Sequence, residues 1–131
     1  MNSATKKDGR LADALRVKTP TIIYGVDALA TVVRALEQAA NKALVPVDGR
    51  GEVEAAALRS SIDAQAKGGG PVVVLLGTEI SDDARAVLTT YVEDEPIAKL
   101  VAITAASAPS DAMARLFPLQ LAAARALEGA N

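Results

Sequence analysis

Residues 21–47 read TIIYGVDALATVVRALEQAANKALVPV and contain the repeating unit from which the fold is predicted. Thr21–Tyr24 and Ala43–Val47 are short, mainly apolar runs without polar alternation, which is typical of strands covered on both faces. Between them, apolar side chains recur at helical spacing, at Leu29, Val32, Val33, Leu36 and Ala40. Asp27 precedes this segment and is expected to cap the helix.

The same unit recurs along the chain. Two more buried strands are expected, and helices are expected between and after them. The strands are Pro71–Leu76 and Lys99–Thr104, and the helices are Leu11–Val17, Glu52–Lys67, a segment capped by Ser81, and Ser110–Leu127 with a bend at Pro118. Alternating strands and helices predict a three-layer α/β/α sandwich with a mostly parallel sheet of four to five strands.

Composition and charge limit the possible functions. The chain has 131 residues and a net charge of −2, and half of its residues are hydrophobic, so we expect a flexible basic tail over residues 1–10 and a single α/β domain over 11–131. The acidic balance and an aromatic content of 2% argue against a nucleic-acid binder. Any RNA contact is expected only through Lys6, Lys7 and Arg10 of the tail.

The residue types also exclude several chemistries. The chain has no cysteine and no histidine, which removes disulfides, thiolate catalysis and the commonest general base and zinc ligand. An enzyme built from this chain would have to use carboxylates, lysine, tyrosine, hydroxyls or a borrowed metal. We predict no catalytic residue, no resident metal and no cofactor. The longest apolar run, Pro71–Gly77, is far too short to span a membrane, and a cytoplasmic location without membrane contact is expected.

Candidate ligand-binding residues follow the predicted strands, because ligands of open α/β sheets bind beyond the carboxyl ends of the strands. They are Tyr24, Gly25 and Asp27 after the first strand, Asp48, Gly49, Arg50 and Gly51 after the second, and Thr78 and Glu79 after the third. The DGRG turn resembles a phosphate-binding turn, although ordinary turn chemistry explains the same residues. Asp27, Asp48, Glu52 and Glu79 could hold Mg²⁺ together, or else serve only as caps and solvated side chains.

Three segments resemble a known family. YGVDAL (24–29) with RALEQAANKALVPV (34–47), GGPVVVLLGTEISDDARAVL (69–88) and AKLVAIT (98–104) are similar to the C-terminal domain of archaeal and eukaryotic peptide-release factors, which shares its fold with kink-turn-binding ribosomal proteins. The RNA-binding branch carries Asn-Glu and a Lys where this chain has Asp27, Ala28 and Thr31. The resemblance therefore implies a non-catalytic binding or adaptor domain with protein partners, associated with translation and the ribosome.

A second resemblance lies at the far end of the chain. FPLQLAAARALEGAN (117–131) resembles the closing helix of the sugar isomerase (SIS) family, which also favours a Gly-Pro entering a strand, as at Gly70-Pro71. This resemblance implies a small phosphosugar-binding domain that works as a dimer. A purely structural assembly subunit is the third possibility.

The C-terminal segment is the candidate partner interface. If it is helical, one broad apolar face includes Met113, Phe117, Gln120 and Leu121, and it is expected to bind a protein partner or a second copy in a homodimer. The alternative is that Phe117 and Leu121 fold into their own core.

Overall fold

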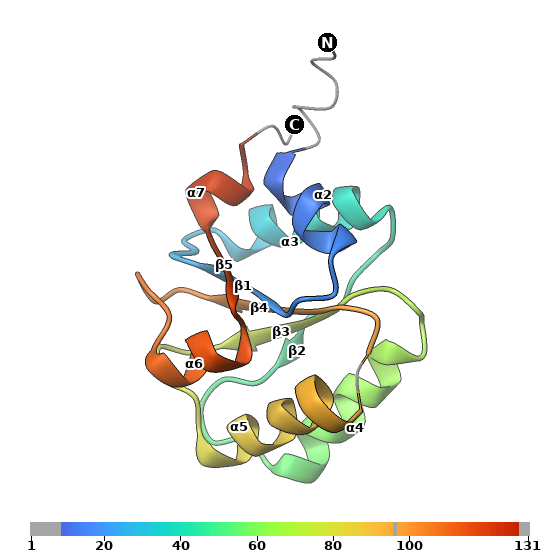
Figure 1. Cartoon of the computed structure of the whole chain (residues 1–131), viewed down its shortest axis with the longest axis vertical. Helices are drawn as coiled ribbons and strands as arrows, with labels where there is room; N and C mark the ends of the chain where they lie inside the picture. The colour runs from blue at the N-terminus through green and yellow to red at the C-terminus, as the bar shows by residue number, and fades with distance from the viewer. Residues whose placement is uncertain (1–8, 96, 129–131) are drawn as a thin grey trace.

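Five parallel strands form the middle layer of the protein in the computed structural model, which describes residues 9–95 and 97–128 (Figure 1). The strands are β1 (Thr21–Tyr24), β2 (Val47–Asp48), β3 (Val72–Leu76), β4 (Leu100–Thr104) and β5 (Leu119–Ala122). Their spatial order is β2-β3-β4-β1-β5, and every pairing is parallel. The predicted mostly parallel sheet is therefore confirmed, with β2 and β5 at its edges.

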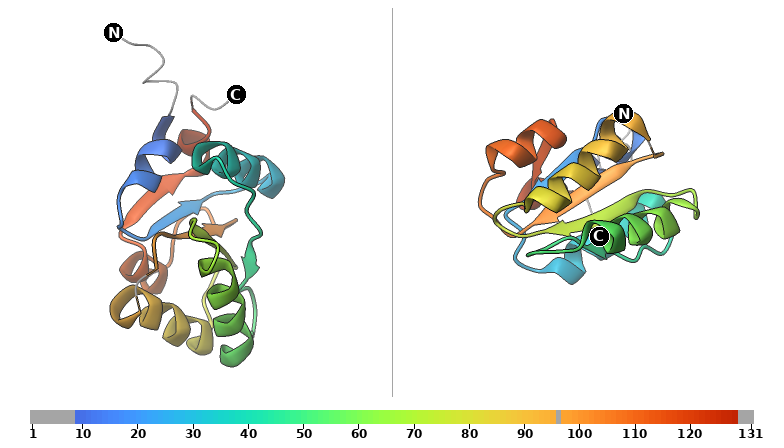
Figure 2. Two further views of the ribbon diagram at one scale, coloured as in Figure 1. Left: turned by 90° about the vertical axis from the view of Figure 1, so that its right-hand side faces the viewer. Right: turned by 90° about the horizontal axis from the view of Figure 1, so that it is seen from below.

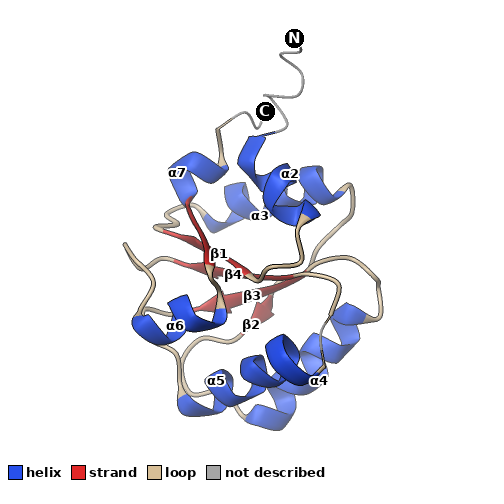
Figure 3. Cartoon of the chain, viewed as in Figure 1, coloured by secondary structure: helices blue, strands red, loops and turns tan. Residues whose placement is uncertain are grey.

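Helices cover both faces of this sheet (Figures 2 and 3). One face carries α2 (Gly9–Arg16), α3 (Leu29–Ala40) and α7 (Ala123–Ala126); the other carries α4 (Ala55–Ala66), α5 (Asp82–Thr89), the π-helical turn η1 (Thr90–Asp94) and α6 (Asp111–Leu116). The predicted three-layer α/β/α sandwich is confirmed.

Alternate side chains of the strands enter two separate cores. Ile22 of β1 packs into the cluster under α4, α5 and α6, whereas Ile23 packs into the cluster under α2, α3 and α7, and both are 0% exposed. All five residues of β3 and all five of β4 are buried. A strand covered on both faces is apolar at almost every position, which explains the nearly continuous hydrophobic runs in the sequence.

The C-terminal segment differs from its prediction. It is not one bent helix, because α6 ends at Leu116 and the chain after Pro118 forms the edge strand β5, which pairs with β1. Proline cannot continue a helix, and an edge strand tolerates it because it needs no N–H on its outer side. A strand of four residues carries too little alternation to be recognised in the sequence.

The same segment corrects the predicted partner interface. Met113 and Phe117 are both 0% exposed and belong to the core under α4, α5 and α6, so the prediction that they form an exposed interface is wrong and the core alternative holds for Phe117. Gln120 is exposed and Leu121 is half-buried on β5. Only these two residues of the four are accessible to another molecule.

Most of the predicted tail lies outside the described residues. Residues 1–8, including Lys6 and Lys7, are not described, and Gly9 and Arg10 form the start of α2. Across residues 9–95 and 97–128, no helix combines the length and the apolar character that crossing a membrane requires.

A buried lysine holds the link between α2 and β1 in place. Lys99 is 4% exposed and directly precedes β4. Its Nζ donates hydrogen bonds to the carbonyl oxygens of Val17 (2.9 Å) and Thr19 and to Oγ1 of Thr21 (2.8 Å). Burial lowers the pKa of Lys99 to about 8, because removal from water penalises the charged ammonium.

We predict that this lysine makes stability depend on pH. Between pH 8 and 10 the unfolded chain keeps the proton that folded Lys99 has lost, so the free energy of unfolding should rise with pH, by up to about 1.4 kcal/mol per pH unit. Above this window Tyr91 has the opposite effect and lowers the free energy of unfolding as the pH rises. Burial, and then the hydrogen bond to the Asp63 carboxylate, raise the pKa of Tyr91, so the folded chain keeps a proton that the unfolded chain has lost. Urea unfolding at a series of pH values measures the slope.

Lys99→Met should remove this slope, whereas Lys67→Met, at an exposed lysine, should leave it in place. NMR titration of the Lys99 side chain in the unmutated protein gives a second reading if Lys99→Met does not fold. A titration midpoint near the ordinary lysine value would contradict the prediction.

Candidate functional site

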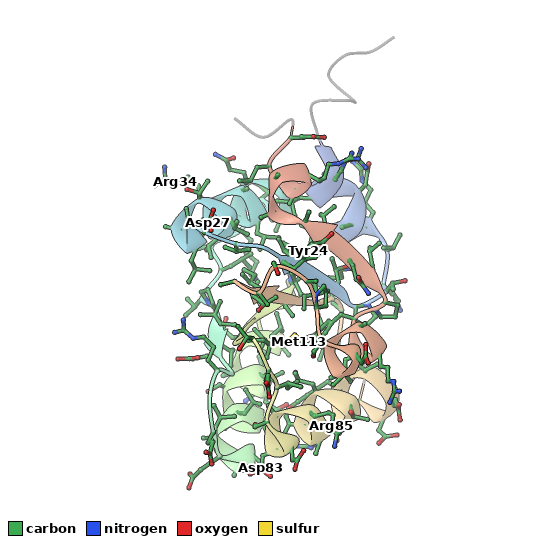
Figure 4. All side chains as sticks on the ribbon, turned by 90° about the vertical axis from the view of Figure 1, so that its left-hand side faces the viewer. Tyr24, Asp27, Arg34, Asp83, Arg85 and Met113 are labelled. Atoms are coloured by element: carbon green, nitrogen blue, oxygen red, sulfur yellow. The ribbon has the colours of Figure 1, made fainter. Side chains whose placement is uncertain are left out.

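The order of the strands places a topological switch point at the carboxyl end of β1. This strand lies between β4 and β5, and the helix after β1 covers one face of the sheet while the helix after β4 covers the other. The chain therefore continues from β1 and from β4 to opposite faces of the sheet, and such topological switch points are where open α/β sheets bind ligands. Figure 4 shows this side of the molecule, with Tyr24 at the end of β1 and Asp27 at the approach to α3.

A threonine hydroxyl joins the strand ends next to this switch point. Oγ1 of Thr104 donates to the carbonyl oxygen of Gly77 at 2.8 Å and accepts from the N–H of Ala106 at 3.1 Å. The turn after β1 is bound to the same loop, because Gly25 N–H donates to Ala106 O at 2.7 Å and Val26 N–H donates to Thr104 O at 3.1 Å. The start of the turn is thus fixed, and these two amide groups are not available to a ligand.

The N-terminus of α3 follows this turn and has no side-chain cap. Its N-cap residue is Ala28, whose carbonyl accepts from Thr31 and Val32 at 3.2 and 3.3 Å. The first N–H groups of a helix have no acceptor within it, which leaves those of Leu29 and Ala30 directed out of the helix end. The positive end of the helix dipole adds to the attraction that these groups offer an anion.

The prediction that Asp27 caps this helix is wrong, since Asp27 lies one residue before the N-cap and makes no capping hydrogen bond. Its carboxylate is exposed beside the turn. Gly25 has φ +70°, a left-handed conformation that strains other residues, and no atom lies within 4 Å of the position that a Cβ would take. The backbone at Gly25 is therefore open to approach from solvent.

The DGRG turn after β2 is explained by contacts within itself. Arg50 donates from its main-chain N–H and from Nε to Oδ1 of Asp48, both at 3.0 Å. The side-chain hydrogen bonds of Arg50 lower the pKa of Asp48. Gly49 is closely packed, because a Cβ there would lie 3.0 Å from the side chain of Val74, and Gly51 has φ +71°. Turn chemistry is sufficient to account for these residues, and a phosphate at this turn stays an untested prediction.

The end of β3 carries an acidic rim. Thr78 and Glu79 are exposed, and a pocket of 460 Å³ lies beside them between the loops that follow β2 and β3. Its lining residues are Glu52, Val53, Ile80, Ser81, Asp82 and Asp83. In the described part of the chain, no three His, Cys, Asp or Glu side chains come together as a metal site. Asp27, Asp48, Glu52 and Glu79 therefore follow strands at one edge without converging on a cation.

Sequence reasoning placed residues 104–110 at the end of the fourth strand, but it assigned no role to the Thr104 hydroxyl or to Ala106, and it missed the N-terminus of α3 at Ala28. Thr104 is a polar residue at the end of a buried apolar run, 1% exposed, and a buried hydroxyl normally has a hydrogen-bond partner. That signal could have identified Thr104. Ala28 and Ala106 act through main-chain atoms, and no side-chain motif identifies them.

Two solved structures of Thermotoga maritima RuvB share this fold. A RuvB mutant matches with a TM-score of 0.62 at 14% sequence identity, and the RuvB Holliday junction branch migration motor matches with a TM-score of 0.56 at 16% identity. Each comparison covers 92% of this chain and 44% of the RuvB chain, so the protein spans less than half the length of these structures. No protein-family model and no curated protein matches the sequence. At such identities the likeness shows the fold alone.

These findings correct the two family resemblances. The structure matches RuvB and supports neither the release-factor and kink-turn group nor the sugar isomerase family. The predicted functions that depend on these resemblances, a translation-associated adaptor and a phosphosugar-binding domain, are overturned with them. The physical reason is that TIIYGVD and VVVLLG describe any buried parallel strand followed by a turn, so short apolar segments do not distinguish families of this class.

The starts of α5 and α3 allow a capped and an uncapped helix to be compared by mutation. Ser81 caps α5, because its Oγ accepts from the N–H of Ala84 at 3.1 Å, whereas Asp27 makes no such bond. Ser81→Ala should therefore lower the free energy of unfolding by about 1 kcal/mol. Asp27→Ala should change it by less than about 0.5 kcal/mol. Urea unfolding of the two variants at one pH tests this, and equal losses would show that Asp27 does act as a cap.

Proposed function

We propose that this domain binds a magnesium–nucleotide complex through its phosphates at the turn between β1 and α3, and that it hydrolyses the nucleotide slowly or not at all. The observation that carries the proposal is the uncapped start of α3 at the switch point between β1 and β4. The fold of a branch migration motor supports a nucleotide as the first ligand class to test.

The main chain supplies the phosphate contacts in this proposal. The N–H groups of Leu29 and Ala30 point out of the helix end, and a strand, a turn and a helix N-terminus in this order form the phosphate site of P-loop proteins. That motif reads GxxxxGK[ST]. If Thr31 is taken as its hydroxyl residue, Tyr24 and Leu29 replace the glycines and Ala30 replaces the lysine.

The missing lysine determines what the site can do. No lysine occurs between Lys18 and Lys42, so no ammonium from this segment neutralises the phosphates or stabilises charge during phosphoryl transfer. Two N–H groups and the helix dipole can still hold a phosphate, but they provide little of the charge stabilisation that transfer requires. Binding without rapid turnover follows from this arrangement.

The negative charge at the carboxyl edge of the sheet decides whether the nucleotide binds alone or as its Mg²⁺ complex. Asp27 and Glu79 are exposed carboxylates that follow β1 and β3 at the same edge, and both repel a free polyphosphate. A bound Mg²⁺ reverses this effect, because Mg²⁺ takes one or two protein carboxylates together with phosphate oxygens and water. The nucleotide should therefore bind with Mg²⁺ and not without it.

Restoring the lysine gives a direct test. Ala30→Lys puts an ammonium in the first turn of α3, where a charge-assisted hydrogen bond to phosphate should raise the affinity for Mg-ATP about tenfold or more. The matched control is Gln38→Lys, which adds the same charge at an exposed position in the last turn of α3. Titration calorimetry of both variants and of the unmutated protein, with and without Mg²⁺, provides the comparison.

Absence of Mg-ATP binding to the unmutated protein at millimolar concentration would contradict the proposal. Equal gains in Ala30→Lys and Gln38→Lys would assign the effect to net charge rather than to this turn. A release of inorganic phosphate at the rate of a motor enzyme would contradict the expected lack of rapid hydrolysis.

A further inference from the structure

The outer edge of β5 is open to a further strand. Within residues 9–95 and 97–128, β5 pairs only with β1, and Leu119 N–H donates to Pro20 O on that inner side. Main-chain groups of successive strand residues point to alternate sides, so Gln120 and Ala122 direct their N–H and C=O groups outward. An unpaired edge of this kind is a template for pairing with another chain.

An apolar groove runs beside this open edge. It has a volume of 460 Å³ and lies between α2, the link to β1, and β5. Its lining residues are Arg10, Asp13, Ala14, Val17, Thr19, Pro118, Leu119 and Leu121. Val17 is 45% exposed there, and Val45, on the loop before the opposite edge strand β2, is the other large hydrophobic residue with high exposure among the described residues.

We propose that a second copy of this chain occupies the groove, with the two β5 strands paired antiparallel across a twofold axis. In that register Gln120 of one copy lies opposite Ala122 of the other, and their outward N–H and C=O groups pair in both directions. Leu121 then lies opposite its own counterpart on the α2 side of the sheet. Pro118 has no N–H to donate, so pairing is confined to the strand residues that follow it.

The charges of α2 favour a second copy over an unrelated peptide. Arg10 and Asp13 both line the groove, three residues apart on one helix, with opposite signs. A twofold axis that brings Arg10 of one copy opposite Asp13 of the other forms the same pair a second time, as a self-complementary interface requires. Their present pairs, Arg10–Glu128 at 3.6 Å and Asp13–Arg16 at 2.8 Å, are exposed and cost little to exchange.

Sedimentation velocity of the full chain over a range of micromolar concentrations tests the proposal. The unmutated protein should dimerise. Val17→Asp should give a folded monomer, because the substitution puts a carboxylate into the apolar groove. The matched control, Val45→Asp, changes the other exposed valine on the opposite side of the sheet and should leave the dimer intact. Circular dichroism confirms the fold of each variant.

A charge exchange tests the geometry separately. Arg10→Asp and Asp13→Arg should each weaken the dimer at least several-fold, and the double variant should recover it, because the pairing of opposite charges across the axis is restored. Failure of the double variant to recover the dimer would overturn the α2 pairing. A protein that stays monomeric at high micromolar concentration, or equal effects of Val17→Asp and Val45→Asp, would overturn the second copy as occupant of the groove.

Discussion

The hydroxyl of Thr104 connects the parts of the molecule on which the candidate site depends. It binds Gly77 at the end of β3 and Ala106 in the loop after β4, and the carbonyl oxygens of that loop hold the N–H groups of Gly25 and Val26. Three strand ends are thereby fixed relative to one another. Because the beginning of the turn after β1 is held in this way, α3 starts at a defined place beside the switch point between β1 and β4, and its free N–H groups come after the fixed part of the turn.

The two sides of this arrangement differ in what they can recognise. The carboxyl edge of the sheet combines an uncapped helix start with exposed carboxylates such as Asp27 and Glu79, which suits a phosphate only when a divalent cation accompanies it. At the opposite end of the strands, the ammonium of Lys99 donates hydrogen bonds to the carbonyl oxygens of Val17 and Thr19 and to Oγ1 of Thr21. That lysine fixes α2 rather than binding a ligand, and α2 forms one wall of the groove beside β5.

The sequence predicted the layers well and the site only in part. Strands such as Val72–Leu76 are buried on both faces, so their composition alone indicates a parallel sheet, and Ser81 is a strong cap signal that the structure confirms. The edge strand β5 was missed because it is short and follows α6 directly. The uncapped start of α3 was also missed, because main-chain groups cannot be recognised from side-chain patterns. Asp27 is a typical N-cap residue type, but it lies one residue before the N-cap position.

Amide chemical-shift mapping with Mg-ATP tests the central claim most directly, because the proposed contacts are main-chain N–H groups. Two-dimensional ¹⁵N–¹H spectra should show the largest changes for Leu29 and Ala30, with smaller ones at Asp27 and Glu79, and only in the presence of Mg²⁺. Spectra that stay unchanged, or changes that centre on the opposite edge around Lys42 and Lys99, would contradict a nucleotide site at the turn between β1 and α3.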